Sequence, residues 1–246
     1  MSHYVVGVIV ENIGQLDTVM EPYDENLEVE PRIDMTKEEL AEEFEDVKKA
    51  IREGTNKFLV EENEKNDVLG MTPREFNQWY YGGSMFDDEG NLLTTRNPNG
   101  KWDWFVIGGR WEGYLKLKDG SRANYAKIKD IDFSMDKKAY EEAKRYWELV
   151  VDGELPEEGE EKPFSFYKKE YYLETYGDKE AYAKRMAQFS VFALLNEGEW
   201  FEQGQMGWFG MSDKTKESED AFLLKMQEII NNANPEHYFI VVDCHI

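Results

Sequence analysis

Cysteine is almost absent from this sequence: Cys244 is the only one, so no intrachain disulfide can form. Long hydrophobic runs are absent as well. The apolar stretch at residues 4–10 is much shorter than the roughly 20 residues that a membrane-spanning helix needs. No basic leader typical of a secretory signal precedes it. These absences exclude a disulfide-stapled scaffold and predict a cytoplasmic protein that does not dock on membranes.

Basic residues are few relative to acidic ones. The chain has 29 Lys and Arg against 52 Asp and Glu, a formal net charge of −23. Such a surface repels phosphate backbones and anionic lipid, which argues against duplex nucleic acid as a direct partner. A local group of cations can still bind a small anion, because charges more than about 8–10 Å away are screened at physiological salt. Hydrophobic residues make up 41% of the chain, enough for a sizeable core.

Familiar catalytic signatures are missing too. The sequence has no Gly-x-Ser-x-Gly elbow, no His-Glu-x-x-His and no Cys-x-x-Cys pair. The Gly108-Gly109 pair lacks the lysine spacing of a phosphate-binding loop and does not open a helix after a strand. The abundance of carboxylates makes any glycosidase-like pair uninformative. No particular cofactor is indicated.

Hydrophobic periodicity predicts an α+β fold. Residues 4–10 and 238–245 are rich in β-branched and aromatic residues and are expected to pair, with further strands at 189–195 and 200–203. Thr36 with Glu39, and Thr72 with Glu75, are capping boxes that predict helix starts. Further helices are expected at 136–151, 167–187 and 217–231, and a β-hairpin at 101–118. The element order favours one domain, residues 1–246, with a ferredoxin-like antiparallel sheet built from 1–12 and 188–246 and a helical and hairpin insertion at 13–187.

The predicted hairpin holds the first candidate site. Tryptophans offer flat stacking surfaces, paired glycines let the backbone approach a ligand, and cations can meet an anionic group. The loop at 204–210 could complete a pocket beside it. The candidate ligand-binding residues are Lys101, Trp102, Asp103, Trp104, Gly108, Gly109, Arg110, Trp111 and Trp208. The alternative interpretation is a tight hairpin whose tryptophans belong to the core and whose Arg110 pairs with Asp103.

The second candidate site lies at the chain ends. If residues 4–10 pair antiparallel with 238–245, His3 lies near His245, and Asp243 is on the same strand face as His245. These side chains could hold a metal ion or act as an acid–base pair. The alternative is that the histidines are structural. Cys244 points to the opposite face and is expected to be a small buried apolar residue rather than a nucleophile.

Several of these segments resemble an uncharacterised family of proteins encoded by bacteriophages and prophages. The matching stretches span the chain, at residues 1–3, 22–26, 97–104, 107–111, 129–132, 204–208 and 242–246. Gly100 stands where the family is expected to carry a small polar residue, a change that a turn tolerates. The resemblance implies an accessory phage protein in the cytoplasm of an infected bacterium and supplies no activity.

Taken together, the sequence leads to three functional hypotheses. The first is a protein that binds a small nucleotide-like anion at the hairpin without turnover, to sequester a host defence signal. The second is a hydrolase that uses His3, Asp243 and His245. The third is an acidic interaction protein that mimics nucleic acid and occupies a host protein.

Overall fold

The computed structural model describes residues 2–207 and 211–246, and the chain divides into two compact units. One comprises residues up to 24 together with 101–246, and the other comprises 25–100. This differs from the single domain expected from the sequence, because residues 25–100 bury a hydrophobic core of their own. The predicted insertion at 13–187 is therefore not one body: residues 101–187 belong to the unit of the main sheet.

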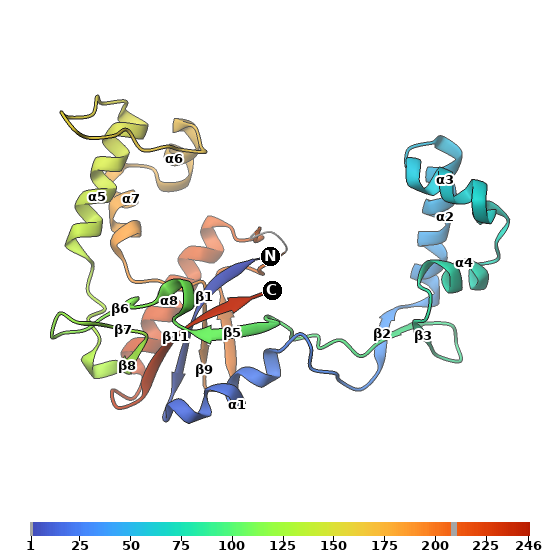
Figure 1. Cartoon of the computed structure of the whole chain (residues 1–246), viewed down its shortest axis with the longest axis horizontal. Coiled ribbons are helices and arrows are strands. Elements are labelled where there is room, and N and C mark those ends of the chain that lie inside the picture. The colour runs from blue at the N-terminus through green and yellow to red at the C-terminus, as the bar shows by residue number, and fades with distance from the viewer. Residues whose placement is uncertain (1, 208–210) are drawn as a thin grey trace. The chain divides into compact units, whose positions relative to one another are not determined.

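The main sheet of the first unit brings the two ends of the chain together (Figure 1). Strand β1 (His3–Val10) pairs antiparallel with β11 (Tyr238–His245) and parallel with β9 (Ala193–Asn196). Strand β10 (Glu199–Glu202) pairs with β9, while β5 (Trp104–Ile107) and β8 (Tyr125–Lys127) both pair with β11. The order is β10-β9-β1-β11-β5, with β8 also on β11.

Because successive side chains of a strand point to opposite faces, the sheet has one hydrophobic core on each face. On one face, helix α8 (Lys216–Asn232) packs Met226 and its neighbours against Val5 and Phe239. On the other face, Val6 and Val242 pack with Met20 of α1 (Leu16–Met20). Both faces are buried along most of β1 and β11, which explains why these segments are continuously apolar.

The α+β class is confirmed, whereas the ferredoxin-like arrangement is not. That arrangement is antiparallel throughout, but β9 lies directly beside β1 and parallel to it. The predicted hairpin is also wrong. Gly108 and Gly109, both with positive φ, turn the chain into a short 3-10 helix, η4 (Gly109–Trp111). As a result β5 pairs with β11, and β6 (Leu115–Lys116) pairs with β7 (Arg122–Ala123).

The first unit also contains helices outside the main sheet. Asp136 caps α5 (Lys137–Trp147), which continues as a π-helical segment, η6 (Glu148–Asp152). Helices α6 (Lys169–Tyr176) and α7 (Lys179–Ala187) are separated at Gly177, and they share an aromatic core with α5. The remaining 3-10 helices of this unit are η1 (Ile13–Gln15), η2 (Glu21–Tyr23) and η5 (Ile128–Asp130).

The second unit contains α2 (Lys37–Glu53), α3 (Lys57–Asn66), η3 (Val68–Gly70) and α4 (Pro73–Tyr80) around a core centred on Phe44 and Phe76. Both predicted capping boxes are present. A small sheet accompanies the helices, with β2 (Arg32–Met35) and β3 (Met85–Phe86) on either side of β4 (Leu92–Thr94). Within the described residues, no helix of either unit is long and apolar enough to cross a membrane.

Candidate acid–base site

Two histidines lie side by side where β1 begins and β11 ends. His3 and His245 are direct partners in the antiparallel register, so their side chains project from the same face. Their ring centroids are 5.0 Å apart and the rings are inclined by 72°. Asp243 lies on the same face, two residues before His245. The proximity that the sequence predicted is therefore present.

Each histidine binds its own aspartate. His3 Nδ1 lies 2.8 Å from Asp243 Oδ1, and His245 Nδ1 lies 2.6 Å from Asp103 Oδ1. A carboxylate accepts the Nδ1 proton and thereby leaves Nε2 as the atom that can accept or deliver a proton. Asp103 is positioned by its backbone N–H, which donates to the carbonyl oxygen of His245 at 2.9 Å. The site thus contains two His–Asp pairs rather than one shared carboxylate.

Asp243 is buried and fully engaged. Its side chain is only 3% exposed, and its second oxygen accepts the backbone N–H of Arg110 at 2.9 Å. Gly109 permits this approach, because a Cβ at that position would lie 2.5 Å from Asp243 Oδ2. The η4 turn therefore fixes the carboxylate that orients His3.

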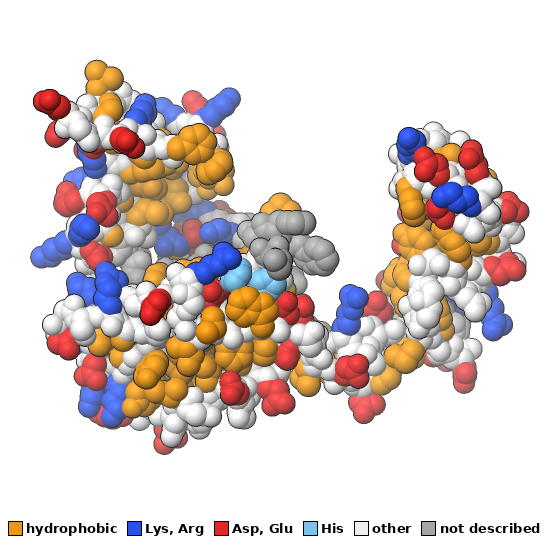
Figure 2. Space-filling view, viewed as in Figure 1, with side chains coloured by type: hydrophobic (Ala, Val, Ile, Leu, Met, Phe, Trp, Pro, Cys, Tyr) orange, Lys and Arg blue, Asp and Glu red, His pale blue; other side chains and the backbone are white. Residues whose placement is uncertain are grey.

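Trp104 forms the outer wall of the pair. It is the register partner of His245 on β5 and stacks on that ring, with centroids 5.1 Å apart and planes 15° apart. It also contacts the His3 ring edge-on at 5.2 Å. The indole is 44% exposed, so the imidazoles lie directly beneath the surface. Figure 2 shows histidine atoms reaching that surface beside hydrophobic side chains.

His245 carries an unused polar atom. Its Nε2 is buried and has no hydrogen-bond partner among residues 2–207 and 211–246. Buried polar atoms are ordinarily paired, so an unpaired one calls for an explanation, and a catalytic role is one such explanation. Within the same residues, no group of three or more His, Cys, Asp or Glu side chains is arranged to hold a metal ion.

The hairpin candidates separate into different environments. Trp102 is buried in the α1-side core, where its Nε1–H donates to the Met20 carbonyl, and Trp111 packs against the α8-side core. The ammonium of Lys101 is paired with Glu202 at 2.6 Å. The core interpretation therefore holds for Trp102 and Trp111. The Asp103 carboxylate, the partner that the alternative interpretation gave to Arg110, binds His245.

The remaining predicted residues belong to the histidine site. Asp103 and Trp104 touch His245, and Gly109 and Arg110 hold Asp243; Gly108, with its backbone against Asn124, begins the turn that places them. Trp208 lies outside the described residues. The loop before it approaches the same end of the sheet, because the Ser2 hydroxyl donates to the Gly207 carbonyl at 3.1 Å. Burial raises the pKa of the Cys244 thiol, in keeping with an inert residue on the opposite face.

No protein-family model, curated protein or solved structure matches this chain. Functional assignment therefore rests on the site's own geometry. The resemblance to phage-encoded proteins stays a prediction.

Proposed function

We propose that this protein is an acid–base hydrolase of small nucleotide-like phosphoesters. The observation that carries the proposal is the adjacent pair of imidazoles, each bound through Nδ1 to a separate aspartate. This arrangement leaves two neighbouring Nε2 atoms, one of which can act as base while the other acts as acid.

The chemistry needs only water as a second reactant. One neutral imidazole accepts a proton from water as the water oxygen attacks phosphorus. The bond from phosphorus to the leaving oxygen breaks, and the other imidazole, protonated at the start, donates its proton to that oxygen. A proton exchanged through solvent restores the starting state. The aspartates hold the tautomers and stabilise the imidazolium that forms.

Two exposed side chains argue for a nucleotide-like substrate. Trp104 presents an indole face beside His245, and aromatic faces stack on nucleobases. Arg110 is exposed and leaves the backbone at the residue that binds Asp243, so its guanidinium is available for an oxyanion. The net charge of −23 disfavours long nucleic acids and is compatible with a small anion held by a local cation.

The direct test is turnover of a panel of nucleoside phosphomonoesters, cyclic phosphodiesters and dinucleotides, with thermal-shift measurements in parallel. We expect hydrolysis of at least one class, because one imidazole can accept a proton from water while the other donates to the leaving oxygen. Chelators should leave the rate unchanged. Thermal shifts without product would instead support binding without turnover, and the absence of both product and shift would sink the proposal.

An interaction role is the second candidate function, and the segment at 153–168 favours it. Large apolar side chains stand in solvent there: Leu155 is 87% exposed, Phe164 76% and Phe166 89%. Arg145 anchors the segment by two hydrogen bonds to Glu160, at 2.9 and 2.6 Å, and lowers the pKa of that carboxyl to about 2. Exposed apolar side chains on a segment that is fixed by hydrogen bonds are typical of binding surfaces.

The charge around this surface selects the partner. The segment carries more exposed glutamates than lysines: Glu157, Glu158 and Glu161 precede the aromatic residues, and Lys162 and Lys168 lie on either side of them. We therefore infer a protein partner with a hydrophobic groove bordered by Lys and Arg. Nucleic-acid mimicry, which would require rows of acids without aromatic residues, is not needed for this contact.

A basic amphipathic peptide of leucine and lysine serves as the probe. The double variant Phe164→Ser with Phe166→Ser should weaken its binding about tenfold or more, since central aromatic residues dominate such contacts. Leu224→Ser is the matched control, because Leu224 is 70% exposed on α8, outside the segment. Equal loss in both variants would contradict the proposal. So would self-association that the double variant abolishes, because the occupant would then be a second copy.

A further inference from the structure

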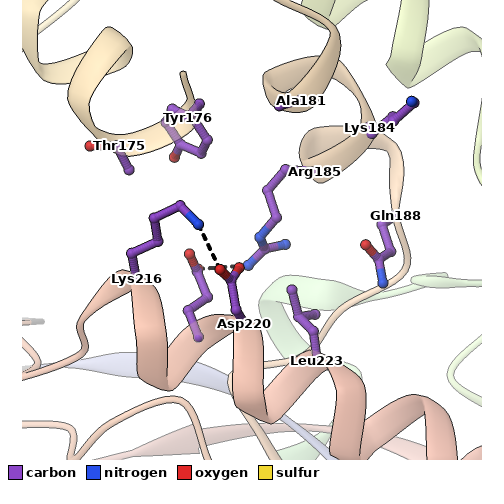
Figure 3. Close-up of a pocket in the computed structure, with 10 residues that line it drawn as sticks. Thr175, Tyr176, Ala181, Lys184, Arg185, Gln188, Lys216, Asp220 and Leu223 are labelled. Atoms are coloured by element: carbon purple, nitrogen blue, oxygen red, sulfur yellow. Dashed lines mark hydrogen bonds and ion pairs between the residues drawn. The ribbon is translucent and has the colours of Figure 1, made fainter. Parts of the chain in front are cut away.

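A cavity separate from the histidine site lies between the end of α6, the second half of α7 and the start of α8 (Figure 3). Its volume is about 220 Å³. It is lined by Thr175, Tyr176, Ala181, Lys184, Arg185, Gln188, Lys216, Glu219, Asp220 and Leu223. The chain has a net charge of −23, so three basic side chains in one lining, Lys184, Arg185 and Lys216, call for an explanation.

The carboxylates of the lining are already neutralised. Glu219 accepts from Arg185 Nη2 at 2.6 Å, and Lys216 donates to Asp220 at 2.6 Å. Lys184 is held less closely, because its nearest carboxylate, Glu180, is 3.9 Å away. The lining therefore retains positive charge after its internal pairs are formed.

Arg185 supplies an unused donor at the cavity. Its Nε is buried and has no hydrogen-bond partner in the part of the chain that the structure describes. The Glu219 contact fixes the guanidinium, and Figure 3 shows this side chain reaching from α7 into the space facing α8. A guanidinium engages oxyanions through parallel N–H donors, so a fixed, unpaired Nε–H is suited to an oxygen of an anionic ligand.

The other walls suit a compact ligand. Burial raises the pKa of Tyr176 to about 12, so its hydroxyl stays protonated and can donate. Gln188 offers an amide, while Ala181 and Leu223 are apolar. Drug-sized ligands fill roughly 300–1,000 Å³, so this cavity fits a smaller molecule.

We propose that this cavity binds a compact oxyanion, a phosphate or a small carboxylate, which the Arg185 Nε–H and the Lys184 ammonium hold while Tyr176 and Gln188 complete the contacts. The proposal is independent of the acid–base site, since none of its residues touches His3 or His245.

The test follows the arginine Nε–H resonances of the full chain by ¹⁵N–¹H NMR during titration with inorganic phosphate and, separately, with acetate. Sodium chloride at equal ionic strength is the reference. The Arg185 signal should move saturably with at least one anion and not with chloride. The anion whose titration saturates at the lower concentration shows whether phosphates or carboxylates are the preferred class of ligand.

Variants separate binding from general charge. Lys184→Gln keeps the Arg185–Glu219 pair and the Arg185 signal, and it should weaken binding several-fold. Lys225→Gln removes the same charge from α8 outside the cavity lining and should have no effect. The proposal fails if the Arg185 signal is unmoved by both anions, or if Lys184→Gln and Lys225→Gln weaken binding equally.

Discussion

Replacing His245 with glutamine should lower kcat/KM for the phosphoester substrate by about 10²–10⁴-fold, the usual contribution of one general acid or base. Glutamine can keep a hydrogen bond to Asp103 and contact with Trp104, but it cannot exchange a proton at neutral pH. Because the loss falls on proton transfer, kcat should drop more than KM rises. Steady-state kinetics of the purified variant measure both.

The remaining histidine provides a matched control. His237 precedes β11 at its opposite end, where its backbone N–H bonds to Asn234, and it touches neither imidazole of the site. His237→Gln should leave kcat/KM unchanged, while His3→Gln should resemble His245→Gln. A His245→Gln enzyme with full activity, or equal losses in His237→Gln and His245→Gln, would rule out the imidazole pair as the catalytic groups.

Asp103 distinguishes orientation from proton transfer. Asp103→Asn should lower the rate less than His245→Gln, by about tenfold or more, because an amide can donate to Nδ1 and favour the wrong tautomer. The loss should fall on kcat more than on KM, since the neutral amide no longer stabilises the imidazolium. A merely structural role for Asp103 would alter stability and leave kcat unchanged.

The parts of the fold that local chemistry determines were predictable. The capping boxes at Thr36 and Thr72 satisfy helix ends within four residues of sequence, so they need no tertiary information. The pairing of β1 with β11 followed from two apolar, β-branched segments of similar length, and it brought His3 beside His245. That half of the site was accessible to sequence reasoning.

The other half depends on contacts between distant segments. Asp103 becomes the partner of His245 only because β5 adds to the edge of β11, a pairing across more than a hundred residues that strand patterns do not specify. The apparent hairpin failed for the same reason. The aromatic segments on either side of Gly108-Gly109 were predicted to pair with each other. In the structure, β5 pairs with β11 and β6 pairs with β7. One feature of the sequence does point to this contact. Asp103 is a polar residue between two tryptophans at the start of a strand, which indicates a carboxylate with a specific partner.

The division of the chain into two units also depends on contacts between residues that are distant in sequence. The helices of residues 25–100 were expected, but periodicity does not say whether helices pack on the sheet or on one another. In the structure Phe44 stacks on Phe76, with ring centroids 4.3 Å apart, and this contact helps close a separate core. The antiparallel assignment of the sheet failed because the long connection between β1 and β9 allows a parallel neighbour.

The substitution Gly109→Ala, which adds one methyl group, is expected to destabilise the protein by about 3–5 kcal/mol. This is the usual effect of breaking a buried ion pair, here the one between His3 and Asp243. Alanine at φ 54° costs about 1 kcal/mol in backbone strain alone. The larger effect comes from the new Cβ, which would lie 2.5 Å from Asp243 Oδ2 and 2.6 Å from Asp243 Cβ. Asp243 must then move, and it loses the Arg110 N–H or His3.

Gly120→Ala isolates the strain from the clash. Gly120 also has positive φ, at 89°, but a Cβ there meets nothing within 4 Å. Urea unfolding should therefore show a loss of about 1 kcal/mol for Gly120→Ala and a much larger one for Gly109→Ala. The His3 ring signals should shift in NMR spectra only of Gly109→Ala. Similar stabilities for the two variants would mean that the η4 turn yields without disturbing Asp243, and that this carboxylate is not held by the close approach of Gly109.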